Sequence, residues 1–338
     1  MRFIHLLALT LLLAACSSSE ENELTRLEDF YRRARQYYDV GDLPRAQQQA
    51  SMGLALEPDH PKLNLVMGRT LLQWRDLKHV AAAREYLEKA HDLDPDYRTT
   101  YSLGEYHLRY AEFLLGESAI LEARLEEMAG EEGESLADMK TRAETAQGKA
   151  EDHLNQAEEF LSETSTAIPD DRFTMRLLAN CYTHMERTDE ALEVLQKLIS
   201  ELQRSRRYKN ERLALQELNL PQEDALRQAL RADMDMEIQA RGLASTIYLD
   251  SKRYPEAVQE LTAILNLNPE LSHEYFNRGM CYYWLGDLSS AAEDMQVFVR
   301  KTDRQIESKE VSQALDIIQA YKNRRNVPLA EEATPTQG

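Results

Sequence analysis

The sequence contains few of the residues that interrupt or terminate helices. Of its 338 residues only 12 are glycine and 10 are proline, whereas 43% are hydrophobic and 29% are charged. Glycine and proline are the least favourable residues in a helix interior, so their scarcity favours helices over sheets. The length allows two ordinary domains or one long array, and the composition predicts an all-α protein with a substantial core.

Positive charge is also scarce. The 40 lysine and arginine residues are outnumbered by 59 aspartate and glutamate residues, which gives a formal net charge of -19 and leaves acidic residues along the whole chain. A protein with this charge repels the phosphates of DNA and RNA. It is not attracted to anionic lipid either. We therefore expect no nucleic-acid partner.

One apolar run stands out, at the N-terminus. Residues Phe3 to Leu13 form a stretch of about eleven residues, which is too short to span a bilayer but suits the hydrophobic region of a secretory signal peptide. The residues Leu13-Ala14-Ala15-Cys16 follow, and then three serines beginning at Ser17. This arrangement resembles the lipobox of bacterial lipoproteins. The alternative is an ordinary signal peptide with a cysteine at this position by chance.

The lipobox resemblance implies what happens to Cys16. In that family the cysteine thiol is joined to diacylglycerol, the chain is cut before it, and the new N-terminus is acylated. Ser17 in place of an aspartate favours the outer membrane, by analogy with the family. We therefore expect a signal peptide over residues 1–15, a lipidated cysteine with a linker over 16–26, and a mature protein anchored at the periplasmic face of the cell outer membrane.

A ten-residue phrase occurs near both ends of the chain. It reads YYDVGDLPRA from Tyr37 to Ala46 and YYWLGDLSSA from Tyr282 to Ala291. Two aromatics, then Gly-Asp-Leu, then an alanine three residues later indicate a helix that ends, turns and restarts as a second helix packed on the first. Repetition of such a unit predicts a stacked array rather than a single closed core.

These units resemble tetratricopeptide repeats, whose usual length is 34 residues. The resemblance rests on small residues in the first helix, turn glycines such as Gly41 and Gly286, alanines in the second helix and closing prolines such as Pro58. It implies an all-α helix-turn-helix solenoid of about six repeats. We expect repeats one and two over residues 27–96, repeat three with a long helical hairpin over 97–170, repeats four to six over 171–303, a capping helix over 304–323, and a disordered tail over 324–338.

Repeat three departs from the usual pattern because its turn does not arrive. Apolar residues continue through two long stretches, and in the second, from Leu136 to Phe160, their spacing alternates between three and four. This spacing predicts a hairpin with a coiled-coil-like seam, and about 30 residues per arm would make each arm roughly 45 Å long. Asn219-Leu220-Pro221 predicts a helix stop and restart, so repeats four and five are expected to share a second pair of long helices.

Catalytic and metal-binding motifs are lacking. The sequence has no glycine-rich phosphate loop, no Gly-x-Ser-x-Gly and no His-Glu-x-x-His. His153 lies on the predicted seam, where packing is favoured over metal ligation. Cys181 and Cys281 occupy equivalent places in separate repeats, which favours two buried thiols over a disulfide. We predict no catalytic residue, no metal, no cofactor and no small-molecule substrate.

The repeat resemblance also implies a peptide-binding groove. In that family the first helix of each repeat lines a concave face, to which extended or helical peptides bind. Aromatic and arginine side chains suit such a surface. Arg176 and Asn180 resemble part of the carboxylate clamp of chaperone-binding members, whose other residues are missing from adjacent repeats. Core packing is the alternative role for some of the aromatics. The predicted groove residues are Tyr31, Arg35, Tyr38, Arg69, Arg98, Tyr101, Arg109, Arg176, Asn180, Phe276, Tyr283 and Trp284.

These observations predict a non-enzymatic scaffold that binds a protein or peptide partner and assists assembly of an envelope complex. The alternative is a structural subunit of a pilus, secretion or export machine that contacts its partners through the 97–169 hairpin. An enzyme or an enzyme's regulatory subunit has no support in the residues. A basic run from Arg204 to Arg212 leaves two interpretations, a docking site for an acidic partner or a solvated helix face.

Overall fold

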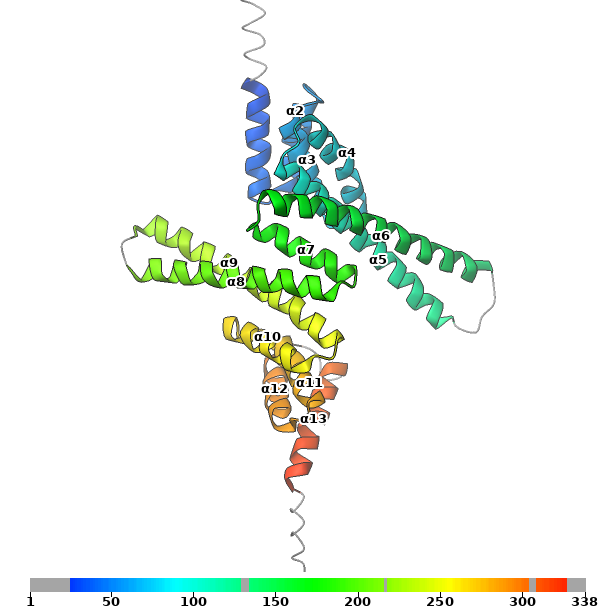
Figure 1. Cartoon of the computed structure of the whole chain (residues 1–338), viewed down its shortest axis with the longest axis vertical. Helices are drawn as coiled ribbons and strands as arrows, with labels where there is room; N and C mark the ends of the chain where they lie inside the picture. The colour runs from blue at the N-terminus through cyan, green and yellow to red at the C-terminus, as the bar shows by residue number, and fades with distance from the viewer. Residues whose placement is uncertain (1–24, 129–133, 216–217, 304–307, 327–338) are drawn as a thin grey trace, which may run out of the picture. The chain divides into compact units, whose positions relative to one another are not determined.

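The computed structural model describes residues 25–128, 134–215, 218–303 and 308–326 (Figure 1). The regular structure within these ranges is α-helical and includes no strand, which confirms the predicted all-α class. The signal peptide, Cys16 and the tail from residue 327 lie outside the described residues, so lipidation and tail disorder stay predictions. None of the described helices is both long enough and apolar enough to cross a bilayer.

The chain forms two compact bodies that divide between Glu186 and Arg187, and we call them the N-terminal body and the C-terminal body. Consecutive helices of the N-terminal body pack against one another, as in a chain of helical hairpins. Its helices are a first helix over residues 25–39, then α2 (Leu43–Leu54), α3 (Pro61–Leu72), α4 (Leu77–Leu93), α5 (Tyr97–Glu127), α6 (Glu134–Ala167) and α7 (Arg172–His184).

Aspartate side chains begin four of these helices. The N-cap side chains of α2, α4 and α7 each accept a hydrogen bond from the backbone N–H three residues later. These N-cap residues are Asp42, Asp76 and Asp171. Asp96 begins α5 with a reciprocal capping box, in which the hydroxyl of Thr99 also accepts from the backbone N–H of Asp96. Each cap satisfies donors that the first helical turn leaves unpaired.

The first copy of the repeated phrase forms a Schellman turn between the first helix and α2. The backbone N–H of Gly41 donates to the Tyr38 carbonyl at 3.0 Å, and the N–H of Asp42 donates to the Tyr37 carbonyl at 2.9 Å. Gly41 has a φ of 78°, in the left-handed region that glycine adopts without a Cβ clash. The phrase therefore predicts this turn correctly.

The core of the N-terminal body depends on close approach of α3 and α4. Leu72 and Leu87 are completely buried, and Gly68 faces the side chain of Leu87. A Cβ added at Gly68 would lie 2.5 Å from Leu87 Cδ2, which is closer than packed atoms tolerate. The small residue at this position thus sets the spacing between the two helices.

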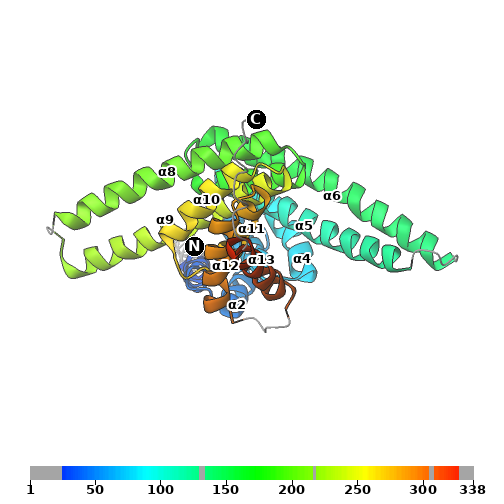
Figure 2. The same ribbon diagram turned by 90° about the horizontal axis from the view of Figure 1, so that it is seen from below.

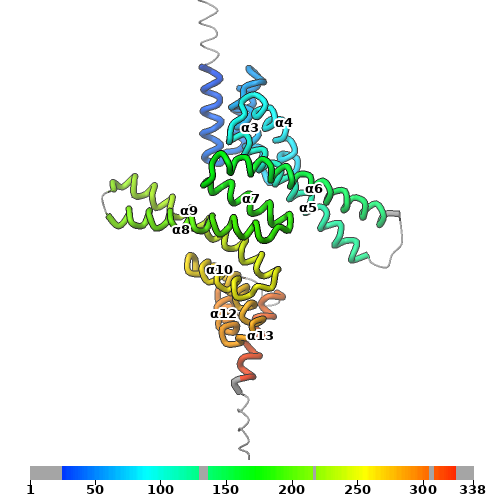
Figure 3. The backbone as a smooth tube through the Cα atoms, viewed as in Figure 1, coloured from blue at the N-terminus to red at the C-terminus, as the bar shows by residue number. Residues whose placement is uncertain are grey.

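Helices α5 and α6 form the predicted long hairpin and lie side by side in each view (Figures 2 and 3). They contain 31 and 34 residues, which corresponds to roughly 45–50 Å each at 1.5 Å per residue. The α6 seam is built from small buried residues, including Ala143, Ala150 and Ala157. The Ser118 hydroxyl donates to the Ala143 carbonyl at 3.2 Å, so the backbones of the two arms approach closely there. The hairpin and its alanine seam were both predicted correctly.

The C-terminal body begins with a second long pair of helices, which confirms the expectation for repeats four and five. Asn219 begins the second of these with a capping box to Gln222 and a proline in the first turn, as predicted. The helices are α8 (Thr188–Ala214), α9 (Leu220–Asp250), α10 (Tyr254–Leu267), α11 (Ser272–Trp284), α12 (Leu288–Lys301) and α13 (Lys309–Asn326).

The basic run on α8 partly serves the interior of this body. Arg206 Nε approaches Glu237 Oε2 to 2.8 Å, outside hydrogen-bond geometry, and Lys209 forms an ion pair with Asp233. Both carboxylates belong to α9 and are buried. Neither interpretation from the sequence accounts for these two residues, because their charge neutralises carboxylates of the facing helix.

Two further turns have the same left-handed backbone conformation, one at a glycine and one at a lysine. Gly286 has a φ of 82° and repeats the Schellman bonds of the first turn, with N–H donation from Gly286 to Tyr283 and from Asp287 to Tyr282. Lys252 occupies the equivalent position between α9 and α10 with a φ of 57°. A side chain in that region strains the backbone, so this turn holds the same geometry at an energetic cost.

The last helix, α13, packs on α12 as the expected cap. Val311, Ala314, Ile317 and Ile318 join the buried cluster around Phe298. Leu315 is exposed and does not join this cluster, whereas Ile317 is buried in it. The helix also continues to Asn326, beyond the expected boundary at residue 323.

Candidate functional site

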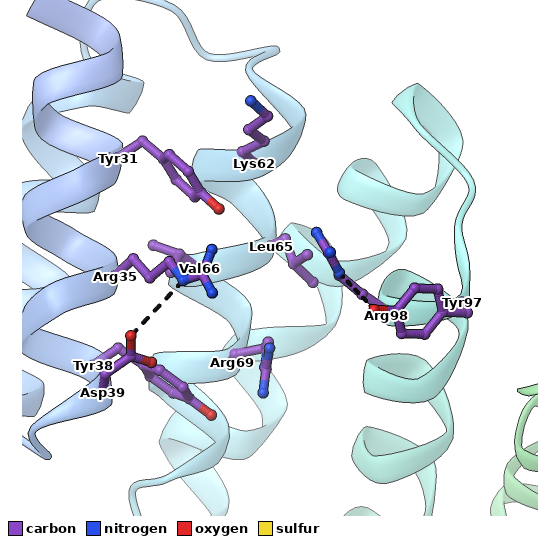
Figure 4. A pocket seen from close by; sticks show the side chains of 10 residues that line it. All are labelled: Tyr31, Arg35, Tyr38, Asp39, Lys62, Leu65, Val66, Arg69, Tyr97 and Arg98. Carbon is purple, nitrogen blue, oxygen red and sulfur yellow. Dashed lines mark hydrogen bonds and ion pairs between the residues drawn. The ribbon is translucent and has the colours of Figure 1, made fainter. Parts of the chain in front are cut away.

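The first helices of repeats one, two and three line a pocket of about 330 Å³ in the N-terminal body (Figure 4). Side chains from the first helix and α3 recur every three or four residues, which places them on one face of each helix. The start of α5 adds two neighbouring residues. The lining residues are Tyr31, Arg35, Tyr38, Asp39, Lys62, Leu65, Val66, Arg69, Tyr97 and Arg98.

A second pocket, of about 270 Å³, continues the first. The two share Arg69, Tyr97 and Arg98, so they form one trough, which we call the N-terminal groove. The second pocket adds Tyr101 and Thr164 to the wall, and Asp171 and Phe173 at the start of α7. The groove therefore brings together six of the predicted residues, namely Tyr31, Arg35, Tyr38, Arg69, Arg98 and Tyr101.

Cations dominate the charge of this groove. Arg35 pairs with Asp39 at 3.8 Å, and both side chains are largely exposed. Among the described residues, no carboxylate forms an ion pair with Lys62, Arg69 or Arg98. The carboxylate of Asp171 accepts hydrogen bonds from the N–H and hydroxyl of Thr174, so it is already engaged in capping α7.

Aromatic rings hold three of the cations in place. Lys62 Nζ lies 5.5 Å from the ring centroid of Tyr31, and Arg69 Cζ lies 5.1 Å from that of Tyr38. Arg98 Cζ lies 5.4 Å from the ring centroid of Tyr97, whose hydroxyl accepts from Arg98 Nε at 3.1 Å (Figure 4). Cation–π contacts of this kind orient a charge without neutralising it.

Two polar groups in the groove have properties that suit hydrogen bonding to a ligand. The Nε of Arg69 is buried and finds no hydrogen-bond partner within the described part of the chain. Burial raises the pKa of Tyr101, with a smaller contribution from Glu105, while Arg176 and Arg69 oppose the rise. The Tyr101 phenol therefore stays protonated and can act as a donor at neutral pH.

The three remaining predicted residues of the N-terminal body lie in a different pocket, of about 350 Å³. Arg109, Arg176 and Asn180 line it together with Trp74 and Glu112. Arg109 already pairs with Glu105 at 2.8 Å. The structure thus divides the predicted set between two hollows of this body.

The predicted residues of the C-terminal body divide between its core and its surface. Phe276 is a core residue, because its ring packs against Phe298 with centroids 5.1 Å apart. Its assignment to a groove wall was therefore wrong. Tyr283 and Trp284 are exposed at the end of α11, and Trp284 stacks on Tyr254 with ring centroids 4.9 Å apart.

Several groove residues were missed by the sequence reasoning, although two of them carried a usable signal. Lys62 lies seven residues before Arg69, and Tyr97 lies four residues before Tyr101, so each shares a helix face with a predicted residue. Phe173 lies three residues before Arg176, but Arg176 lines the other pocket, so this spacing would not have placed Phe173 in the groove. Its position depends on where the long hairpin places the start of α7, which a local pattern does not reveal.

Other chemistry-bearing residues pack inside the bodies. The Nδ1 atoms of His107 and His153 lie 2.8 Å apart between α5 and α6, so one ring donates to the other. Among the described residues, no group of three or more histidine, cysteine or acidic side chains is arranged to hold a metal. Cys181 and Cys281 are both buried, as predicted, and Cys281 is a free thiol whose pKa is raised to about 11 by burial.

Comparisons with known proteins support the fold. Two sequence profiles, each described as tetratricopeptide repeat, match residues 245–316 and 174–202. No curated protein sequence matches the chain. The solved structure of Pseudomonas aeruginosa pilF has a TM-score of 0.50 at 12% identity, with 87% of this chain and 99% of that chain covered.

Two other solved tetratricopeptide repeat proteins are similar at lower TM-scores. TTC0263 of Thermus thermophilus gives 0.44 at 15% identity, with 76% of this chain and 99% of that chain covered. YrrB, described as having an unusual peptide-binding site, gives 0.45 at 13% identity, with 79% and 97% covered. At such identities the likeness concerns the fold alone. The matched residues and the paired helices show that this chain contains tetratricopeptide repeats and has the all-α solenoid fold that such repeats build.

Proposed function

We propose that this protein is a non-enzymatic scaffold that binds a segment of a partner protein in the N-terminal groove. One observation carries the proposal: helices from three successive repeats place aromatic and cationic side chains in one continuous trough. Tyrosine and arginine are the residues that contribute most to binding at protein interfaces. Tyrosine offers a large contact area with few torsions to freeze, and arginine can donate a fork of hydrogen bonds.

The scaffold acts by multipoint capture. A partner segment lying along the groove contacts Tyr31 and Lys62 at one end and Tyr101 and Phe173 at the other, with Arg69 between them. The wall is formed by packed helices, so little of the binding energy is spent on ordering the protein. No bond is made or broken in this mechanism.

We further propose that the scaffold works at the cell envelope, held there by a lipid on Cys16. The apolar run, the small residues and the cysteine of the N-terminus support this anchor. The captured partner would then be a component of an envelope complex, and the protein would assist its assembly at the periplasmic face of the outer membrane. Palmitate labelling of the full chain and of Cys16→Ser tests the anchor, and equal labelling of the two would rule it out.

A second candidate function uses the α5/α6 hairpin as the contact surface, in a structural subunit of a pilus, secretion or export machine. Ile120 favours this alternative, because a large aliphatic side chain on the arm is 71% exposed. The hairpin would then join neighbouring subunits through its outer face, and the groove would not need to bind a ligand.

One affinity experiment separates the two functions. The full chain is compared with an Arg69→Glu/Tyr101→Ala variant and with a variant in which a short glycine linker replaces residues 117–147. The linker is feasible because the two arms run close together at this level, where Ser118 and Ala143, just inside the replaced segment, share a hydrogen bond. Quantitative mass spectrometry of captured membrane proteins should show the same partners with the shortened hairpin and their loss with the groove variant. The reverse pattern would support the hairpin, and circular dichroism checks that both variants remain helical.

A further inference from the structure

The N-terminal groove is a basic site in an acidic protein. The chain has a formal net charge of -19, yet the groove presents Arg35, Lys62, Arg69 and Arg98 against only two carboxylates, Asp39 and Asp171. Asp171 keeps its charge while it accepts from Thr174, so the four cations still outnumber the two carboxylates. This local charge is opposite in sign to that of the molecule as a whole.

Several cations elsewhere in the N-terminal body form ion pairs with nearby carboxylates. Arg84 pairs with Glu88 and Lys89 with Asp59, each at 2.7 Å, and Arg45 pairs with Asp42 at 3.2 Å. Lys62, Arg69 and Arg98 differ because their nearest interactions are with tyrosine rings. Like charges held together raise the free energy of the unliganded state, and an anion would remove that repulsion.

We propose that the N-terminal groove is specific for an acidic segment, with Asp or Glu carboxylates bound at Arg69 and its neighbours. The inference rests on the peptide-binding function proposed above and names the class of segment. Arg69 is the central anchor, since it belongs to both pockets and its buried Nε has no hydrogen-bond partner in the described structure. A rotation of the Arg69 side chain would expose this Nε, and a carboxylate accepting from Nε and a terminal nitrogen would then satisfy the donor in the bidentate geometry that guanidinium favours.

The same contacts argue against a nucleic acid as the occupant. Single strands bind basic grooves by stacking bases on open aromatic faces. The rings of Tyr31, Tyr38 and Tyr97 are each approached by a cation instead. The overall negative charge also repels a polyphosphate chain more strongly than a short peptide with a few carboxylates.

The apolar side chains of the groove determine which residues of the bound segment can lie between its acidic residues. Leu65 and Phe173 lie on the wall of the two pockets, and Phe173 is 55% exposed. An apolar or aromatic residue of the segment can cover these side chains while its acidic neighbours reach the cations. The expected ligand is therefore acidic with interspersed apolar residues, rather than a uniform run of glutamates.

A random peptide display library tests this inference and does not require the natural partner to be identified. Peptides of about twelve residues are selected on the immobilised full chain, on Arg69→Glu and on Arg33→Glu, and their Asp and Glu content is compared with the unselected library. Arg33→Glu makes the same charge change on the first helix at an exposed position outside the groove lining. We expect acidic residues to be enriched at least about twofold by the full chain and by Arg33→Glu, and this enrichment to disappear or reverse with Arg69→Glu.

The outcomes are distinguishable. Non-specific attraction to so acidic a chain would enrich basic peptides. Enrichment of acidic peptides would therefore have to come from a specific site. Peptides that depend on the groove but show no acidic enrichment would overturn this inference and leave the proposed function intact. A failure to select any peptide whose binding differs between the full chain and Arg69→Glu would overturn both. A labelled single-stranded oligonucleotide that binds with the same Arg69 dependence would assign the groove to nucleic acid instead.

Discussion

The guanidinium of Arg69 lies over the ring of Tyr38, 5.1 Å from its centroid, and both side chains line the N-terminal groove. The two residues come from neighbouring repeats, since Tyr38 is on the first helix and Arg69 is on α3. This contact joins adjacent repeats at the binding surface and fixes the direction in which the cation points. It makes the shape of the groove a property of how the repeats stack.

Removing the ring should weaken ligand binding more than removing the hydroxyl. Tyr38→Ala is expected to lower the affinity for a selected peptide by about 0.5–2 kcal/mol, because Arg69 loses its orienting contact. Tyr38→Phe keeps the ring and should remain within about twofold of the unmodified chain. Isothermal titration calorimetry measures both. An equal loss in the two variants would show that the hydroxyl, and not the ring, matters.

The left-handed turns should respond to substitution according to their φ angles. A Cβ added at Gly286 would meet no atom within 4 Å, so Gly286→Ala adds only backbone strain. We expect it to lower the free energy of unfolding by about 1 kcal/mol, and Lys252→Gly to raise it by up to about 1 kcal/mol.

Gly242 provides the matched control for these turns. It lies within α9, also with open space around an added Cβ. Gly242→Ala should therefore stabilise the helix by up to about 1 kcal/mol, opposite in sign to Gly286→Ala. Urea unfolding followed by circular dichroism measures all three variants, and a common sign for the two alanine substitutions would contradict the assignment of strain.

The buried histidine pair should make the N-terminal body sensitive to acid. Burial, followed by the neighbouring charge of His153, lowers the pKa of His107 to about 3, and burial also lowers the pKa of His153. Arg84 opposes protonation of both rings, although it is paired with Glu88, and Asp152 favours protonation of His153.

The direction of the effect follows from the lowered pKa values. The folded protein binds fewer protons than the unfolded chain, so stability is fully present above about pH 6.5 and is lost as the pH falls below it. Each histidine contributes up to about 1.4 kcal/mol per pH unit in that range. Trp74 fluorescence in a Trp284→Phe background reports unfolding of this body. A His107→Leu/His153→Leu variant should flatten the profile between about pH 7.5 and 5.5, and an unchanged slope would contradict the pair's role.

The buried carboxylate of Glu237 should be essential to the C-terminal body. Its Oε1 accepts from Arg241 Nε at 3.0 Å, and Arg206 approaches its other oxygen. Glu237→Gln leaves Arg206 without this carboxylate, while Arg241 keeps its ion pair with Glu260, and is expected to cost about 3 kcal/mol of unfolding free energy. Glu223 pairs with Arg227 at the surface, so Glu223→Gln should cost less than about 1 kcal/mol. Comparable losses in the two variants, measured from Trp284 fluorescence in a Trp74→Phe background, would argue against an internal role for this network.

Local patterns in the sequence predict the helices and turns well. Each phrase with Gly-Asp-Leu forms the expected turn, and the alternating spacing of alanines predicts the α6 seam. These features depend on residues close in sequence, where helix geometry alone decides which side chains share a face.

Features that depend on distant partners were harder to predict. Phe276 has the spacing of a groove residue, but its burial is decided by Phe298 on α12. The internal role of Arg206 depends in the same way on Glu237, which is on another helix. The groove cations were partly predicted, but their lack of carboxylate partners becomes visible only when the repeats are stacked.

The α5/α6 hairpin has a consequence for the order in which the chain folds. Its contacts join residues of steadily increasing separation, from Ser118 with Ala143, 25 residues apart, to His107 with His153, 46 residues apart. Pairing that begins near the tip can therefore advance toward the base, each step closing a loop only slightly larger than the last. Such a zipper does not require the rest of the molecule to be present. A chain emerging gradually from a narrow exit could thus complete this element before the repeats on its C-terminal side are available to pack.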